Sequence, residues 1–247
     1  MIAITGMHRS GTSCIVGLLG QCGYSYGQAQ ELLNGNEPQL DNKRGHFENY
    51  KAVLINDMLL HYSGGSWLNP PSQADILKNG TLFEALFNDF SHKFQGHIVK
   101  DPRICLTAEL WEKYCPSLEA IVLCLRNPLG VAESLKTRNK FSIDHGLGLW
   151  CEYNARLLQS IRRIPLVVVD YDRLKDDTER ELHACLQALG SPLSFIEMET
   201  RIKGFYERDL NHDPSSKEDF LALPEVVKRL YTILKSKANS KEGVLCS

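Results

Sequence analysis

The chain has 247 residues and a mass of 27.9 kDa, with 43% hydrophobic and 23% charged residues. These values predict a globular chain with a sizeable core and exclude a disordered, collagenous or coiled-coil protein. The net charge is −2, from 28 Lys and Arg against 30 Asp and Glu. A chain that binds nucleic acid or membrane surfaces in general would lean basic, so any anion binding here must depend on local groups.

The sequence predicts a cytoplasmic protein without a membrane span. Its longest apolar run, Ala120–Leu125, is far shorter than the about 20 residues of a membrane helix. Polar residues follow Met1–Ile4 at once, where a signal peptide would continue with apolar residues. The eight cysteines form no Cys-x-x-Cys pair, and several lie in apolar runs. We therefore expect buried free thiols and a reducing compartment.

Short apolar runs alternate along the chain with longer segments of helical periodicity. The predicted strands are Ile2–Thr5, His97–Lys100, Ala120–Leu125 and Leu166–Asp170. The predicted helices are Asn49–Tyr62, Leu82–Phe94, Leu147–Ile161, Thr178–Leu189 and Pro224–Ser236. Apolar strands separated by helices predict an α/β fold of three layers, nucleotide-kinase-like, with a central and mostly parallel sheet flanked by helices.

Two of these helices have a predicted apolar face. In the first helix the spacing places Val53, Leu54, Met58 and His61 on one face. In the second, apolar residues recur every four positions, at Leu82, Leu86, Phe90 and Phe94. Such faces pack against the core in amphipathic helices.

No repeat or charge block divides the chain, which predicts a single domain over residues 1–247. The segment from about 40 to 72 includes the turn-forming stretch Gly64–Ser72 and is interpreted as a substrate-facing insertion. Residues from about 200 to 247 are expected to form a C-terminal loop and helix, with a second functional loop at Asn211–Ser216.

The segment Gly6–Ser13 follows the first strand and leads into a helix. Its glycine spacing is that of a phosphate-binding loop, in which backbone N–H groups and a helix N-terminus attract an anion. Nucleotide kinases carry Lys after the second Gly, whereas this chain carries Thr12 there and a cation, Arg9, inside the loop. The predicted anion-binding residues are Arg9, Ser10, Gly11, Thr12 and Ser13.

A second anion site is predicted directly after the third strand. Many ATP-using enzymes of this fold carry an Asp at a strand end to position Mg²⁺, whereas this strand is followed by Arg126. Pro128 suits a helix start, and Ser134 lies a little over two turns beyond Arg126. A guanidinium and a hydroxyl that converge on one point suit a phosphate monoester.

Together these segments resemble the signature of sulfotransferases that use 3′-phosphoadenosine 5′-phosphosulfate (PAPS). Arg9–Ser13 matches the family's loop for the 5′-phosphosulfate, and Arg126 with Ser134 matches its element for the 3′-phosphate. Val167–Leu174 is similar to a later strand of the family and Leu149–Leu157 to a helix of bacterial members, so the resemblance extends to about residue 190. It implies PAPS as sulfuryl donor, 3′,5′-diphosphoadenosine (PAP) as product, an acceptor hydroxyl and no metal.

The resemblance also implies catalytic groups. Glu48 follows an aromatic residue, as does the base of glycan-type sulfotransferases. Lys100 matches a lysine that approaches the leaving group, and Arg9 shares that role. His46 and Asp101 remain alternative bases. Glu48 would also suit the first turn of the helix that follows, where the helix dipole favours a carboxylate.

Other residues carry weaker predictions. Asp101 could instead form an ion pair with Arg103 or Arg9. The segment Arg201–Gly204 resembles a family element at the 3′-phosphate, and Trp67 could line the acceptor pocket. His8 would support the shape of the anion loop. The spacing of the remaining histidines and of the cysteines indicates no metal site.

Two other functions remain open at this stage. One is an ATP/Mg²⁺ phosphotransferase with Asp101 or Asp170 as metal ligand, although Thr12 and Arg126 argue against it. The other is a nucleotide-binding domain without catalysis. The sequence does not choose among a small-molecule, glycan, lipid or peptide acceptor, nor does it indicate an oligomeric state or a nucleic-acid partner.

Overall fold

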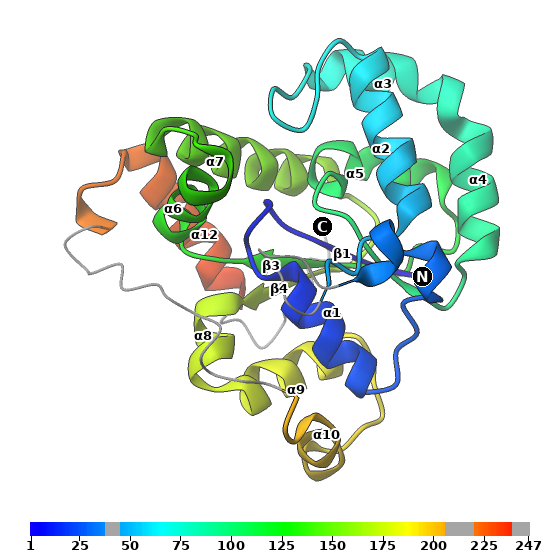
Figure 1. Cartoon of the computed structure of the whole chain (residues 1–247), viewed down its shortest axis with the longest axis vertical. Helices are drawn as coiled ribbons and strands as arrows, with labels where there is room; N and C mark the ends of the chain where they lie inside the picture. The colour runs from blue at the N-terminus through cyan, green and yellow to red at the C-terminus, as the bar shows by residue number, and fades with distance from the viewer. Residues whose placement is uncertain (38–44, 206–219, 239–247) are drawn as a thin grey trace.

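The computed structural model describes the chain over residues 1–37, 45–205 and 220–238. A parallel four-stranded sheet in the order β2-β1-β3-β4 lies at its centre (Figure 1). The strands are β1 (Ile2–Thr5), β2 (Ile98–Lys100), β3 (Ala120–Leu125) and β4 (Leu166–Asp170). The predicted α/β fold is confirmed, and only β2 begins one residue later than expected.

Parallel pairing brings the carboxyl ends of all four strands to one edge of the sheet. Ile2 of β1 pairs with Ile98 of β2 on one side and with Ala120 of β3 on the other. The chain therefore passes from β1 to β2 in one direction and then returns across β1 to β3. In open α/β sheets ligands bind at such a switch point, here beside the carboxyl ends of β1 and β3.

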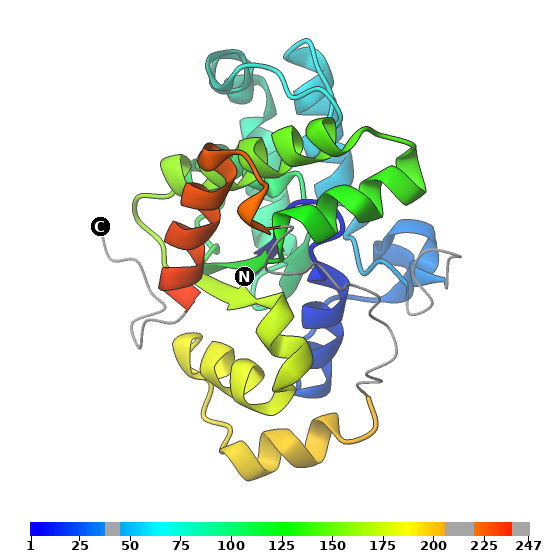
Figure 2. The same cartoon turned by 90° about the vertical axis from the view of Figure 1, so that its left-hand side faces the viewer.

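Helices cover both faces of the sheet, as Figures 1 and 2 show. Alternate strand residues such as Ile4 and Val122 pack against α1, α8, α9 and α10, whereas Ala3 and Ile121 pack on the side of the other helices. Figure 2 shows α12 beside β4 and α7. The α-helices are α1 (Thr12–Gln21), α2 (Tyr50–Tyr62), α3 (Gln73–Gly80), α4 (Glu84–Lys93), α5 (Ile104–Tyr114), α6 (Pro128–Asn139), α7 (Ile143–Ser160), α8 (Tyr171–Asp176), α9 (Thr178–Ala188), α10 (Phe195–Ile202) and α12 (Glu225–Ala238). Short 3-10 helices are η1 (Ala29–Glu31), η2 (Leu33–Asn36) and η3 (Thr81–Phe83).

The predicted apolar face of α2 is wrong in part. Leu54 and Met58 are 44% and 38% exposed, whereas Ile55 and Leu59 are buried. The buried face also contains Asn56, which is completely buried. Because a polar residue occupies the centre of the buried face, the apolar pattern alone selected a neighbouring face.

The predicted apolar face over η3 and α4 is wrong in its first half, whereas Phe90 and Phe94 are buried as predicted. Leu82 and Leu86 are 69% and 42% exposed, and Phe83 and Phe87 are buried instead. A strict four-residue repeat drifts by about 40° per step around a helix of 3.6 residues per turn. The phenylalanines at 83, 87, 90 and 94 follow the helical period more closely and form the buried face.

Further differences between the predicted and the observed helices lie at the helix ends. α7 begins at Ile143 rather than at Leu147 because the side chain of Ser142 accepts a hydrogen bond from His145 N at 3.1 Å. The predicted helix start at Pro128 is confirmed. Helices α3, α5, α8 and α10 had not been predicted. The expected loop at Asn211–Ser216 lies outside the described residues.

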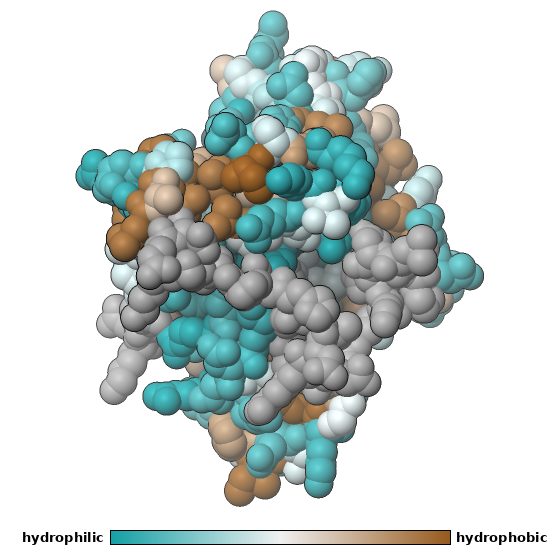
Figure 3. Space-filling model, turned by 60° about the vertical axis from the view of Figure 1, so that its left-hand side comes forward, coloured by the Kyte–Doolittle hydropathy of each residue, from teal (hydrophilic) through white to brown (hydrophobic). Residues whose placement is uncertain are grey.

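None of the helices in the described part of the chain is long and apolar enough to cross a membrane. Figure 3 shows one face of the molecule, on which a group of hydrophobic side chains lies in the upper left part of the view. Among the described residues, five cysteines are buried and are free thiols, as predicted: Cys22, Cys105, Cys115, Cys124 and Cys185.

Candidate active site

The loop between β1 and α1 has a backbone shape that depends on two glycines. Gly6, Arg9 and Gly11 have positive φ values of 145°, 73° and 88°. A Cβ on Gly6 would lie 2.5 Å from the carbonyl oxygen of Cys124, and one on Gly11 would lie 2.3 Å from the ring of Tyr171. α1 begins directly after Gly11, so the positive end of its dipole faces the loop. This is the geometry expected of an anion-binding loop.

Gly11→Ala is therefore expected to destabilise the protein by roughly 2–5 kcal/mol, from the left-handed backbone and the overlap with the Tyr171 ring. The matched control is Gly148→Ala inside α7, where no atom lies within 4 Å of the added Cβ. That change should be neutral or stabilising by up to about 1 kcal/mol. Unfolding in urea measures both, and equal free energies for the two variants would contradict the proposed packing of Tyr171 on Gly11.

Two segments far apart in the sequence meet at this loop. Arg9 Nε donates a hydrogen bond to Ser134 Oγ at 2.9 Å, and Arg126 Nη1 donates one to the carbonyl oxygen of Arg9 at 2.8 Å. The guanidinium of Arg126 also lies over the ring of Tyr171, 5.6 Å from its centroid. The predicted anion-site residues Arg9, Arg126 and Ser134 are thus brought together. Tyr171 was not predicted, although it directly follows the last strand.

A second cluster lies at the end of β2. Lys100 Nζ donates to Glu48 Oε1 at 2.8 Å, to the His46 carbonyl at 2.9 Å and to Ser13 Oγ at 3.5 Å. Ser13 Oγ donates to the same His46 carbonyl at 3.0 Å. The side chains of Lys100 and Glu48 are only 3% and 10% exposed. These contacts join the candidate base and the candidate catalytic cation to the first turn of α1.

Backbone pairing holds Glu48 in this place. Glu48 and Lys100 form an isolated parallel β-bridge, and Asn49 N donates to the Lys100 carbonyl at 3.2 Å. Asn49 then caps α2, because its side chain accepts hydrogen bonds from Lys51 N and Ala52 N. Glu48 therefore precedes the helix instead of lying in its first turn.

The charge state of Glu48 depends on its neighbours. Burial raises the pKa of this carboxyl group, but the charges of Lys100, His8 and Arg103, together with the hydrogen bond from Lys100, outweigh burial and lower the pKa to about 2. In the structure Glu48 is therefore an ionised carboxylate. Without Lys100 beside it, its affinity for a proton would be higher.

Asp101, one of the alternative bases, belongs to a buried polar network. Its carboxylate accepts hydrogen bonds from Arg103 N at 3.0 Å, from Arg103 Nη1 at 2.9 Å and from Asn56 Nδ2 at 2.8 Å. Asn56 Oδ1 accepts in turn from Thr107 and Trp111. Asp101 has no exposed surface, which favours the ion pair with Arg103 over a role as base.

Of two further candidates, one lies away from the anion loop and the other lies beside it. Arg201 Nη1 donates to the Cys22 carbonyl at 3.2 Å, at the end of α1 opposite the anion loop, so the predicted contact of Arg201 with a 3′-phosphate is wrong. Trp67, in contrast, lies beside the loop. Its ring centroid is 4.3 Å from that of His8, and its carbonyl accepts from Tyr153 Oη at 3.0 Å.

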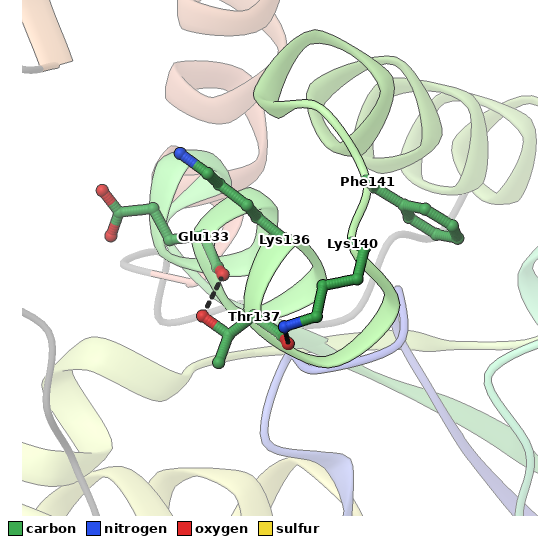
Figure 4. A pocket seen from close by; sticks show the side chains of 5 residues that line it. All are labelled: Glu133, Lys136, Thr137, Lys140 and Phe141. Atoms are coloured by element: carbon green, nitrogen blue, oxygen red, sulfur yellow. Dashed lines mark hydrogen bonds between the residues drawn. The ribbon is translucent and has the colours of Figure 1, made fainter.

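A pocket of about 660 Å³ opens beside α6 (Figure 4). It is lined by Glu133, Lys136, Thr137, Lys140 and Phe141. Figure 4 shows the amino groups of Lys136 and Lys140 well apart and Phe141 on the other side of the chain turn. The pocket borders the site through Phe141, whose ring lies 6.3 Å from Trp67. Within the described ranges, no group of three or more His, Cys, Asp or Glu is placed to bind a metal ion.

Comparisons with known proteins bear on the fold. No protein-family model matches this sequence, and no curated protein matches it significantly. The structure is similar to a solved structure described as a sulfotransferase domain from the curacin biosynthetic pathway, with a TM-score of 0.52 and 13% sequence identity. The match covers 95% of this chain and 97% of that domain. The chain thus has the fold of a sulfotransferase domain.

Proposed function

We propose that the protein transfers a sulfuryl group from PAPS to an acceptor hydroxyl. The observation that carries this proposal is the meeting of Arg9, Ser134 and Arg126 at the carboxyl ends of β1 and β3. Two guanidinium groups, a hydroxyl and a helix N-terminus at a switch point suit a ligand with several phosphate or sulfate groups. The shared fold with a sulfotransferase domain supports the same reading.

The residues of the site suit a donor with two anionic ends. The loop Gly6–Ser13 would hold the 5′-phosphosulfate, and Arg126 with Ser134 would hold the 3′-phosphate. Each ionic contact at ~4 Å contributes on the order of 4 kcal/mol at an effective dielectric constant near 20, before desolvation is subtracted. Local cations can therefore bind a polyanion although the chain has a net charge of −2. The donor, when bound, supplies the sulfuryl group and a phosphate leaving group.

Three residues of the chain have separate roles in the proposed transfer. Glu48 accepts the proton of the acceptor hydroxyl, while Lys100 and Arg9 stabilise negative charge on the leaving oxygen. Lys100 can leave Glu48 for an anion held in the loop, because Ser13, its neighbour, lies at the first turn of α1. Loss of this positive neighbour returns the pKa of Glu48 toward its ordinary value. Occupation of the donor site thereby strengthens the base.

The contacts of the acidic residues disfavour an ATP/Mg²⁺ phosphotransferase. Asp101 is engaged by Arg103 and Asn56. Asp170 Oδ1 accepts from two backbone N–H groups at the start of α8, and its Oδ2 lies 3.3 Å from Lys235 Nζ. The two carboxylates considered as Mg²⁺ ligands, Asp101 and Asp170, are thus each paired with a cation of the protein.

Thermal shifts test the donor site. PAP is expected to raise the melting temperature more than ADP does, because only PAP carries a 3′-phosphate for Arg126 and Ser134. Ser134→Ala should weaken PAP binding by roughly tenfold, the effect of one lost hydrogen bond. Thr137→Ala, an exposed hydroxyl on the same helix, is the matched control and should leave it unchanged.

Equal shifts with PAP and ADP would contradict the two-site interpretation. A larger shift with ADP and Mg²⁺ would favour the phosphotransferase. PAP binding without any formation of PAP from PAPS in the presence of hydroxyl compounds would indicate a nucleotide-binding domain without catalysis.

A further inference from the structure

His8 carries a polar atom that no other group of the described chain satisfies. The residue lies in the anion loop directly before Arg9 and is 7% exposed. Its Nε2 is buried and has no hydrogen-bond partner among the described residues. Leaving a buried polar group without a partner costs about 1–3 kcal/mol, so such a group calls for an explanation.

Several charged side chains influence the ring of His8. Burial, followed by the charges of Arg103 and Lys100, lowers the pKa of His8 well below 6.5, whereas the charge of Glu48 acts in the opposite direction. The ring is thus within electrostatic reach of both Glu48 and Lys100. It is neutral at neutral pH, and a neutral imidazole has one N–H donor and one acceptor nitrogen.

Aromatic side chains shield the ring from solvent. Trp67 lies over it at 4.3 Å, and Tyr153 meets it edge-on at 6.0 Å. Tyr153 also donates to the Trp67 carbonyl, which fixes the turn that carries Trp67. A Cβ on Gly65 would lie 2.4 Å from the Asn69 carbonyl oxygen, so this turn is tightly built. The unpartnered nitrogen therefore belongs to a site from which bulk water is excluded.

We propose that His8 binds the acceptor, with its Nε2–H donating a hydrogen bond to the acceptor hydroxyl oxygen. This inference rests on the proposed sulfuryl transfer and names the acceptor side of the same site. In this arrangement the proton of the acceptor hydroxyl points to Glu48. One lone pair of its oxygen accepts from His8, and the other faces the sulfur atom of PAPS. Trp67 covers the hydroxyl and keeps competing water away from it.

The alternative is that His8 only packs between Trp67 and Tyr153 and supports the turn. Two replacements distinguish these roles. His8→Gln places an amide nitrogen near the position of Nε2 and keeps a donor, whereas His8→Ala removes it. The control is His145→Ala, an exposed histidine whose ring contacts Phe141 at 4.9 Å.

The experiment begins with protein saturated with PAP, which tests the proposed function before any acceptor is added. Phenol, methyl glucoside, N-acetylserine amide and hexanol then serve as probes for aromatic, sugar, peptide and lipid-like hydroxyls. The readout is the Cε1–H resonance of His8 in the NMR spectrum, assigned by its loss in His8→Gln. We expect at least one probe to shift this resonance together with the indole N–H of Trp67. The indole signals of the buried Trp111 and Trp150 should stay in place.

The probe that shifts His8 is next used as the acceptor with PAPS. His8→Ala is expected to raise its KM at least tenfold, with PAP affinity unchanged. The KM of His8→Gln should stay within about threefold of that of the natural chain. The KM of His145→Ala should equal that of the natural chain. An unmoved His8 resonance with all four probes, or an unchanged KM in His8→Ala, overturns the inference. A protein that PAP does not stabilise contradicts the proposed function itself, and the inference with it.

Discussion

Replacement of Glu48 by glutamine is expected to lower the rate of sulfuryl transfer by roughly 10²–10⁴-fold, the usual contribution of a general base. Glutamine keeps an oxygen that can accept from Lys100 Nζ, now 2.8 Å from Glu48 Oε1, so PAP binding should change little. The rate of PAP formation from PAPS, with the acceptor that supports turnover, measures the effect. His46→Gln is the parallel variant, because His46 was the nearest alternative base.

Full activity in Glu48→Gln would exclude Glu48 as the general base. A loss of activity confined to His46→Gln would assign the role of base to His46 instead. The pH dependence adds a second test, because kcat/KM reports the free protein and kcat the occupied one. With a pKa of about 2 in the ion pair, Glu48 is charged in the free protein at every working pH. The acid limb of kcat should therefore lie at higher pH than that of kcat/KM if, as proposed, Lys100 leaves Glu48 when the loop is occupied.

Asp101→Ala is expected to lower the free energy of unfolding by about 3–5 kcal/mol, because it removes the buried partner of Arg103 and leaves only the half-exposed Asp57 beside that charge. Arg103 is 8% exposed and Asp101 is completely buried, so water cannot replace the lost contact. The hydrogen bond from Asn56 Nδ2 is lost as well. Urea unfolding of both proteins gives the difference.

Asp57→Ala is the matched control, because Asp57 contacts the same arginine from a half-exposed position. Its Oδ1 lies 2.5 Å from Arg103 Nε, and its side chain is 46% exposed. Exposed ion pairs contribute about 0–1 kcal/mol, so this variant should lose far less stability. If Asp101→Asn stayed as stable as the natural chain but lost turnover, Asp101 would be the base and its structural role would be wrong.

The sheet could be predicted because its strands are buried on both faces and therefore appear as short apolar runs between polar segments. Which face of α2 is buried could not be predicted, because that face is centred on the polar residue Asn56. That amide is satisfied by Thr107 and Trp111 of α5, a contact across about 50 residues that no local pattern reveals. Hydrophobic periodicity identifies a helix more reliably than it identifies the buried face.

The same limit applies to the candidate site. Arg9, Arg126 and Ser134 could be proposed because they occupy fixed positions relative to strand ends, and strand ends converge in a parallel sheet. The contact of Lys100 with Glu48 arises from a β-bridge of one residue pair, too short to leave a trace in the sequence. The isolated nitrogen of His8 and the ring of Tyr171 against Gly11 likewise depend on tertiary packing alone.

The bridge between Glu48 and Lys100 also covers one edge of the sheet. β2 is an edge strand, and unpaired edges invite strands from other chains. Here Asn49 N occupies the Lys100 carbonyl, and Ile98 N donates to the Ser25 carbonyl at 2.8 Å, so neighbouring segments of the same chain cover that edge. The segment that carries the candidate base thus also prevents this edge from pairing with a strand of another chain. Changes that loosen this segment would expose unpaired backbone groups of β2 and also displace the candidate base.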